Sequence, residues 1–163
     1  MLGNPVPGPE ASRRLKTESD SPAELKARAL RYLVRREHSR AELARKLAPH
    51  AESTQAIEAV LDLLLSKRQQ SDERFAEERA RSLSRKYGAA KIRQDLKARG
   101  IADEVIDRVP ADGELERARA ILERKFRVKS ENRQEQAKRA RFLQGRGFSY
   151  DVIKKALALA DSE

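Results

Sequence analysis

The chain has 163 residues, with 36 Lys and Arg against 26 Asp and Glu, which gives a net charge of +10. It contains no Cys, no Trp and only two His, so disulfides, cysteine-ligated metal centres and thiol catalysis are excluded. No apolar run approaches the roughly 20 residues of a membrane-spanning helix, and no signal peptide opens the chain. We therefore expect a soluble, cytoplasmic protein that contacts no membrane.

The sequence pattern indicates helices rather than strands or disorder. Chains with high charge and few aromatic residues are often disordered, and aromatics are only 4% here, so the argument rests on periodicity. Apolar residues recur at i, i+3, i+4 and i+7 spacing within residues 57–65 and 153–160, which makes an apolar stripe on a helix. No segment rich in β-branched residues alternates with period two. The chain is predicted to be all-α.

Capping signals and glycines place the elements in chain order. Residues 1–20 contain three Pro and two Gly without periodicity and are predicted to be a disordered tail. Ser-Pro-Ala-Glu at residues 21–24 and Ser-Arg-Ala-Glu at residues 39–42 are capping boxes, which start the first two helices. From the second helix onward, the predicted helices cover about 39–49, 54–67, 71–87, 89–99, 102–109, 114–127, 132–144 and 149–160. Gly88 is expected to end the fourth.

An internal repeat groups these helices into three units. Residues 96–106 align with residues 143–153 at a constant offset of 47, where Leu, Arg-Gly, a large apolar residue and Val-Ile coincide. The glycine permits a left-handed turn between two helices. One such unit buries too little surface to fold alone, so we predict three tandem three-helix repeats in an elongated, shallowly curved arrangement. Their predicted bounds are 21–69, 70–110 and 111–163.

Motifs in all three units are shared with one known family. The segments are Ala-Leu-Arg-Tyr-Leu at 29–33, Arg-Glu-His-Ser-Arg-Ala-Glu-Leu at 36–43, Ser-Asp-Glu-Arg-Phe-Ala at 71–76, and the stretches 88–101 and 139–153. Together they resemble the RecX family of bacterial regulatory proteins over roughly residues 23–160. The combination is specific, whereas each piece alone is a weak signal.

The resemblance implies a function and a partner. Members of this family bind the RecA–DNA filament, lie along its groove and restrain its extension, ATP hydrolysis, strand exchange and coprotease activity. The resemblance thus implies a regulator of recombination, DNA repair and the SOS response that is not an enzyme. The expected partner is the RecA recombinase filament, with direct contact to single- or double-stranded DNA as an additional partner. We expect the protein to be a monomer.

Positive charge is spread over all three units rather than gathered in one tail. Such a distribution over an elongated body suits a long anionic partner better than a point ligand. The residues that we expect to contact the filament or its DNA are Arg35, Arg36, Arg40, Arg45, Lys46, Arg79, Arg85, Lys86, Lys91, Arg93, Lys97, Arg99, Lys138, Arg139, Arg141 and Arg146. Two of them, Arg93 and Lys97, are four residues apart and share a helix face.

Other interpretations of the charges stay open at this point. The basic residues solvate helix surfaces and pair with neighbouring acids, or the protein binds DNA or RNA directly without a recombinase, or it is a scaffold for another acidic protein. Phosphate contact predicts binding that weakens steeply with salt. A helix-turn-helix reader over residues 40–47 lacks a cluster suited to base edges. The aromatic residues are expected in the core, against a base-stacking platform: Tyr32, Phe75, Tyr87, Phe126, Phe142, Phe148 and Tyr150.

No motif supports catalysis. The sequence lacks a phosphate-binding loop and a dinucleotide-binding glycine fingerprint. His38 and His50 are expected in turns or at the surface rather than as bases or metal ligands, and Ser39 is expected to be a helix cap. We therefore expect no catalytic residue, no metal and no cofactor.

Overall fold

The computed structural model describes residues 18–162, and within them it contains helices and no strand. The helices are α1 (Pro22–Arg35), α2 (Arg40–Leu47), the 3-10 helix η1 (Ala48–His50), α3 (Thr54–Ser66), α4 (Asp72–Leu83), α5 (Ala89–Ala98), α6 (Asp103–Asp107), α7 (Glu114–Lys125), α8 (Arg133–Gly145) and α9 (Tyr150–Ser162). The all-α prediction is confirmed. None of these helices is long and apolar enough to cross a lipid bilayer. Most of the predicted tail, residues 1–17, lies outside the described residues.

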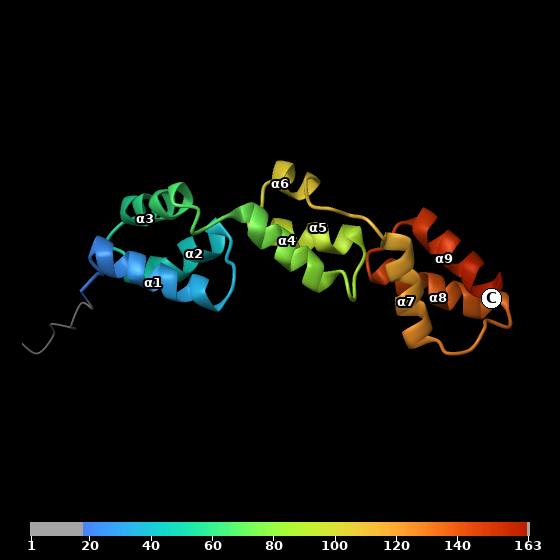
Figure 1. The fold of residues 1–163 in the computed structure, drawn as a ribbon. Helices are drawn as coiled ribbons and strands as arrows, with labels where there is room; N and C mark the ends of the chain where they lie inside the picture. Colours follow the sequence, from blue (N-terminus) through green and yellow to red (C-terminus); the bar gives the residue numbers. More distant parts are fainter. Residues whose placement is uncertain (1–17, 163) are drawn as a thin grey trace, which may run out of the picture.

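The α-helices group by threes into units that follow one another in an elongated row (Figure 1). We call them the first unit (α1–α3), the middle unit (α4–α6) and the third unit (α7–α9). Each unit has its own apolar core, and the three cores share no residue. The most deeply buried members are Leu25, Ala29, Leu43, Leu47, Leu61 and Leu64 in the first unit, Phe75, Ala76 and Leu96 in the middle unit, and Ala118, Leu143 and Ala156 in the third. The predicted row of three-helix repeats is confirmed.

Both predicted capping boxes are present. The Ser21 Oγ accepts the Glu24 N–H at 3.2 Å, and the Glu24 carboxylate accepts the Ser21 N–H at 3.1 Å. Ser39 and Glu42 make the same reciprocal pair at 3.1 and 3.2 Å. These bonds satisfy N–H groups that have no partner inside the helix, so the sequence signal and the helix starts agree.

Successive units meet end to end through their second helices. At the first joint, Ser39 at the start of α2 donates its Oγ–H to the Arg99 carbonyl at the end of α5, at 2.8 Å. At the second joint, the N–H of Gly88 at the start of α5 donates to the Arg146 carbonyl at the end of α8, at 2.7 Å. The last carbonyls of a helix lack intrahelical partners, and here the preceding unit supplies them. The repeated Arg-Gly pair therefore builds both joints.

The two glycines of these Arg-Gly pairs adopt the predicted left-handed conformation. Gly100 has φ +81° and Gly147 has φ +90°. A Cβ on Gly100 would lie 2.5 Å from the Cβ of Ala41, and one on Gly147 would lie 2.6 Å from the Cβ of Lys91. Glycine is required twice over at each joint, by the backbone angle and by the close approach of the neighbouring unit.

Gly88 has a role different from the predicted one. The sequence interpretation ends the fourth helix at Gly88, but α4 ends at Leu83 and Gly88 is the N-cap residue of α5, with φ −85°. A Cβ on Gly88 would lie 2.5 Å from the carbonyl oxygen of Gly147. The close approach of backbones at the second joint, and not a turn, requires glycine here.

One further expectation about a single residue is wrong, and a second residue lies where it was predicted but is more buried than a surface position would be. Tyr150 was expected in the core, but it begins α9 and is 76% exposed. His38 lies in the turn before α2, as predicted, but it is buried. Phe75 and Phe148 are buried core residues, and the other four aromatic residues are half-buried against their units' cores. In the described residues the aromatic rings thus serve mainly to pack the units.

Candidate interface for an anionic partner

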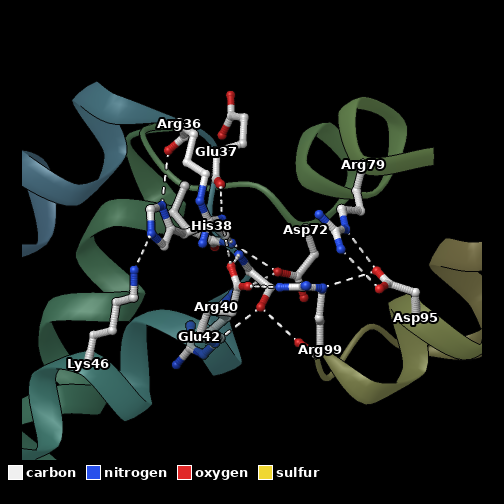
Figure 2. Close-up of polar contacts among 12 residues, drawn as sticks. Arg36, Glu37, His38, Arg40, Glu42, Lys46, Asp72, Arg79, Asp95 and Arg99 are labelled. Atoms are coloured by element: carbon white, nitrogen blue, oxygen red, sulfur yellow. Dashed lines mark hydrogen bonds and ion pairs between the residues drawn. The ribbon is translucent and has the colours of Figure 1, made fainter. Parts of the chain in front are cut away.

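Ion pairs hold the first joint together, as Figure 2 shows. Glu42 lies at its centre with a side chain only 5% exposed, and it accepts from Arg36 at 3.1 Å and from Arg99 at 2.7 Å. Burial alone raises the pKa of the Glu42 carboxyl, but hydrogen bonds from Arg36, Arg99 and the Ser39 N–H outweigh it and hold the pKa below its usual value. Glu42 is therefore ionised and neutralises cations from two units.

Asp95 and Asp72 extend this network. Asp95 accepts from Arg79 at 2.8 Å and from Arg99 at 3.0 Å, and the Arg79 guanidinium lowers the pKa of the Asp95 carboxyl. Asp72 accepts the backbone N–H of Arg40 at 2.9 Å, across the boundary between the first two units. The side chains of Arg79 and Arg99, both expected to contact an anionic partner, are thus engaged inside the protein.

The buried His38 and the half-buried Lys46 form a polar pair beside the network. The Lys46 Nζ lies 2.9 Å from the His38 Nε2 and 4.8 Å from the centre of the Tyr32 ring. A lysine ammonium only donates, so Nε2 accepts, and Nδ1 carries the hydrogen that it donates to the Arg36 carbonyl at 3.0 Å. Burial lowers the pKa of His38. His38 is thus a neutral packing residue that holds Lys46 in place.

More of the predicted contact residues are paired with acids on neighbouring helices. Lys97 and Arg93 share a face, as predicted, because both reach Asp103, at 3.1 and 3.3 Å. Arg93 also binds Asp107 at 2.7 Å. Lys97 lowers the pKa of the Asp103 carboxyl. In the first unit, Arg40 reaches two carboxylates of α3 at 2.5 and 2.7 Å. These pairs tie second helices to third helices.

The second joint gathers cations that have no carboxylate partner among the described residues. Arg85, Lys86, Lys91 and Arg146, all predicted contact residues, meet there. Their hydrogen bonds go to backbone oxygens: Lys91 donates to the Gly145 carbonyl at 3.0 Å, and Arg146 donates to the Lys86 carbonyl at 3.4 Å. Lys91 and Arg146 also lie over the ring of Tyr87. No positive charge is cancelled by these contacts.

A hollow of about 460 Å³ lies among these side chains. We call it the cationic hollow, and it is lined by Arg85, Lys86, Arg124, Lys125 and Arg146 around Tyr87, Ile121 and Phe142. Three helices, α4, α7 and α8, end beside it. Each helix C-terminus carries about half a negative charge, which is too little to offset five cations. The hollow therefore keeps most of its positive charge.

The remaining predicted contact residues are scattered. Arg35 and Arg45 are exposed on the first unit, and Lys138 and Arg141 are exposed on α8. Arg139 is different: it is 6% exposed, its guanidinium lies 4.9 Å from the centre of the Phe126 ring, and it donates to the Val128 carbonyl. The Arg139 side chain therefore packs within the third unit and is not exposed at its surface.

Sequence reasoning missed Arg124 and Lys125. They close the last turn of α7, where basic residues are common because they complement the helix dipole. Arg124 donates to the Arg85 carbonyl at 2.8 Å, and Lys125 lies over the Phe142 ring. The only sequence signal was their position at the end of a predicted helix, and it does not show that α4 ends beside them.

The fold and the hollow define a class: an elongated protein of helical repeats with a cluster of unpaired cations between two of its repeats. Sequence models of the RecX family match most of the chain. Those for its first, second and third three-helix domains match residues 26–64, 71–109 and 112–157. The chain therefore belongs to the RecX family of regulatory proteins.

Relatives and solved structures agree with this assignment. The chain is 45% identical to the regulatory protein RecX of Ralstonia nicotianae over 144 residues, which cover 86% of this chain and 91% of that protein. It is 47% identical to RecX of Leptothrix cholodnii, over 85% of this chain and 90% of that protein. The crystal structure of RecX from Lactobacillus salivarius shares the fold with a TM-score of 0.77 at 22% identity, covering 87% of this chain and 97% of that one.

Proposed function

We propose that the protein binds the RecA–DNA filament and inhibits its extension, ATP hydrolysis, strand exchange and coprotease activity, and so modulates recombination, DNA repair and the SOS response. Membership of the RecX family supports the partner. The observation that carries the binding mode is the cationic hollow, where five cationic side chains have no carboxylate partner among the described residues. The protein acts as a cytoplasmic monomer, without chemistry of its own.

The elongated row of units suits a partner built from repeated subunits. Contacts made by one unit raise the effective concentration of the next unit at its own site, so several weak contacts add to one firm attachment. A protein that bridges neighbouring subunits restrains their relative movement, on which both filament growth and ATP turnover depend. The hollow lies between the middle and third units, so an anion bound there is held by both.

The test is the RecA ATPase on single-stranded DNA with increasing amounts of this protein. We expect inhibition by the wild type. The double variant Arg85→Glu/Lys86→Glu should need about tenfold more protein for the same inhibition, because two cations of the hollow are reversed. The matched control is Lys154→Glu/Lys155→Glu, which makes the same charge change at two exposed residues of α9. Unchanged ATP turnover at saturating wild-type protein contradicts the proposal.

A second candidate function is direct binding of nucleic acid without a recombinase. The hollow favours it, because unopposed Arg and Lys side chains contact phosphates regardless of sequence. Fluorescence anisotropy of labelled single-stranded DNA at several salt concentrations separates the two functions. Tight, salt-sensitive binding to bare DNA with no preference for the RecA filament favours the second.

A further inference from the structure

The two joints can be compared position by position, because the repeat gives each residue of the first joint a counterpart in the second. Three pairs of residues set the register: Ser39 and Gly88 before α2 and α5, Asp72 and Glu114 at the starts of α4 and α7, and Gly100 and Gly147 after α5 and α8. These pairs give offsets of 49, 42 and 47 residues.

A hydrogen bond present at both joints supports this register. At the first joint the Arg40 N–H donates to the Asp72 carboxylate at 2.9 Å. The offsets of 49 and 42 turn this pair into Ala89 and Glu114, and the Ala89 N–H does donate to the Glu114 carboxylate, at 3.1 Å. Residues matched by the offsets therefore occupy equivalent places in the two joints.

At the matched positions the first joint is balanced in charge and the second is not. In the first joint three arginines and three acids lie close together (Figure 2): Arg36, Glu37, Glu42, Arg79, Asp95 and Arg99. Their counterparts, in the same order, are four cations and two apolar residues: Arg85, Lys86, Lys91, Ile121, Phe142 and Arg146. At these positions the second joint thus carries positive charge without the acids that balance it in the first.

The most informative of these differences is at Glu42. The two arginines that donate to Glu42 have Arg85 and Arg146 as counterparts, so both guanidinium groups are kept. Glu42 itself corresponds to Lys91, whose Nζ donates instead to the Gly145 carbonyl at 3.0 Å. The hollow at the second joint is also larger, about 460 Å³ against about 270 Å³ for the matching hollow at the first. The second joint therefore has the arginines and the room for a carboxylate that its own chain does not supply.

We propose that the cationic hollow binds two neighbouring carboxylates on an acidic segment of the protein partner, a subunit of the recombinase filament. This inference rests on the function proposed above and names the occupant of the same site. One carboxylate lies between Arg85 and Arg146, as Glu42 lies between its two arginines in the first joint. The second meets the cations that α7 adds to the hollow, Arg124 and Lys125. Arginine suits this task because its guanidinium forms paired hydrogen bonds with a carboxylate.

The rings in the hollow favour carboxylates over nucleic acid. Lys91 and Arg146 lie 5.3 and 5.5 Å from the centre of the Tyr87 ring, and Arg146 and Lys125 lie 5.1 and 5.8 Å from that of Phe142. A nucleic-acid base would have to displace these cations before it could stack. The cations also gather around one hollow, whereas a groove for a single strand follows the backbone over several nucleotides. DNA phosphate is the alternative occupant, and the experiments separate the two.

The first experiment supplies the missing carboxylate from within the chain. Lys91→Glu puts an acid at the third position of α5, where Glu42 stands in α2, and an acid in the first turn suits a helix. The new carboxylate occupies Arg85 and Arg146, so we expect binding to RecA filaments about tenfold weaker than wild type. The matched control is Lys154→Glu, the same charge change at an exposed residue of α9, which should bind within about twofold of wild type.

Bare single-stranded DNA is the second probe for the same variants. Lys91→Glu should weaken binding to it no more than Lys154→Glu does. An equal loss toward the filament and toward bare DNA assigns the hollow to phosphates and overturns the proposal, as does wild-type filament binding by folded Lys91→Glu. If the wild-type protein does not bind the filament at all, the proposed function fails together with this inference. If the wild type binds and Lys91→Glu binds equally well, only this inference fails.

The second experiment uses the wild-type protein and does not depend on how a variant folds. A water-soluble carbodiimide joins a lysine amine to a carboxylate in contact with it, as an amide with loss of water, and does not join it to a phosphodiester. With RecA filaments on DNA that lacks terminal phosphates, we expect cross-links from the exposed Lys86 or Lys125 to acidic residues of RecA. Mass spectrometry locates them. If Lys86 and Lys125 cross-link to RecA no more than the exposed Lys154 does, the proposal is overturned.

Discussion

The two joints between units share a helix arrangement and differ in their chemistry. At both, the C-terminus of one second helix meets the N-terminus of the preceding one through an Arg-Gly pair. The first joint buries the Glu42 carboxylate between arginines of two units. The second joint relies on backbone hydrogen bonds and on the Glu114 carboxylate, which accepts the Ala89 N–H at 3.1 Å, and the cations of its hollow form no ion pair among the described residues. The repeat thus fixes the geometry of both joints, and the positions of the acidic side chains determine which cations remain without an ion pair.

The largest expected effect comes from breaking the second joint. Gly147→Ala places a Cβ in a left-handed backbone, 2.6 Å from the Lys91 Cβ and 2.7 Å from its backbone nitrogen. We expect a loss of about 3 kcal/mol in the free energy of unfolding, from backbone strain and overpacking together. Urea denaturation followed by circular dichroism measures it.

A neighbouring glycine provides the control for that experiment. Gly145 lies within α8, and a Cβ there would have no atom within 4 Å. Gly145→Ala should therefore stabilise the protein by about 0.5–1 kcal/mol, because alanine is the better helix former. Equal effects of Gly147→Ala and Gly145→Ala would show that the second joint is not held by close backbone contact.

The first joint should be sensitive to acid. The pKa values of Glu42 and Asp95 are lowered in the folded protein, by the hydrogen bonds described above. A lowered pKa adds stability that is complete above the unfolded-state value, near about 4, and is lost as the pH falls through the folded-state value. The urea midpoint of the wild type should thus fall steeply below about pH 4. Glu42→Gln/Asp95→Asn should have a lower midpoint at pH 7 and a flatter decline below pH 4.

Two exposed acids serve as the comparison for the acid effect. Glu52 and Asp151 make no ion pair among the described residues and are exposed. Glu52→Gln/Asp151→Asn removes the same number of carboxyls, and its urea midpoint should follow the wild-type curve. If this variant flattens the decline as much as Glu42→Gln/Asp95→Asn does, the acid sensitivity belongs to the surface as a whole and not to the first joint.

The sequence predicted local structure better than it predicted which cations form ion pairs. The capping box at Ser39 and the left-handed Gly100 follow from a few adjacent residues, and both are present. The pairing of Arg99 with Glu42 joins residues 57 positions apart, and no local pattern predicts it. The sequence predicts Arg139 to be a surface cation, because its burial depends on the Phe126 ring, which follows the end of α7. Paired and unpaired cations can therefore be told apart only in the structure, which shows where the acids of neighbouring units lie.

The middle unit shows a similar limit. The sequence predicted its third helix over about 102–109, and α6 covers Asp103–Asp107. Pro110 follows shortly after and cannot continue a helix, so the helix end was accessible from sequence. The contacts of this helix were not accessible, because they depend on how α4 and α5 pack against it in space.

The smallest expected effect is the sharpest test of the contrast between paired and unpaired cations. Arg40→Glu/Lys97→Glu makes the same charge change as Arg85→Glu/Lys86→Glu in the cationic hollow, but at cations that already bind exposed acids. Surface pairs contribute about 0–1 kcal/mol each, so stability should drop by about 1 kcal/mol and helicity by circular dichroism should persist. Binding to the RecA filament should weaken no more than about twofold, since the acids on α3 and α6 already cancel these charges. A loss equal to that of Arg85→Glu/Lys86→Glu would mean that total charge, and not the unopposed cluster at the second joint, governs binding.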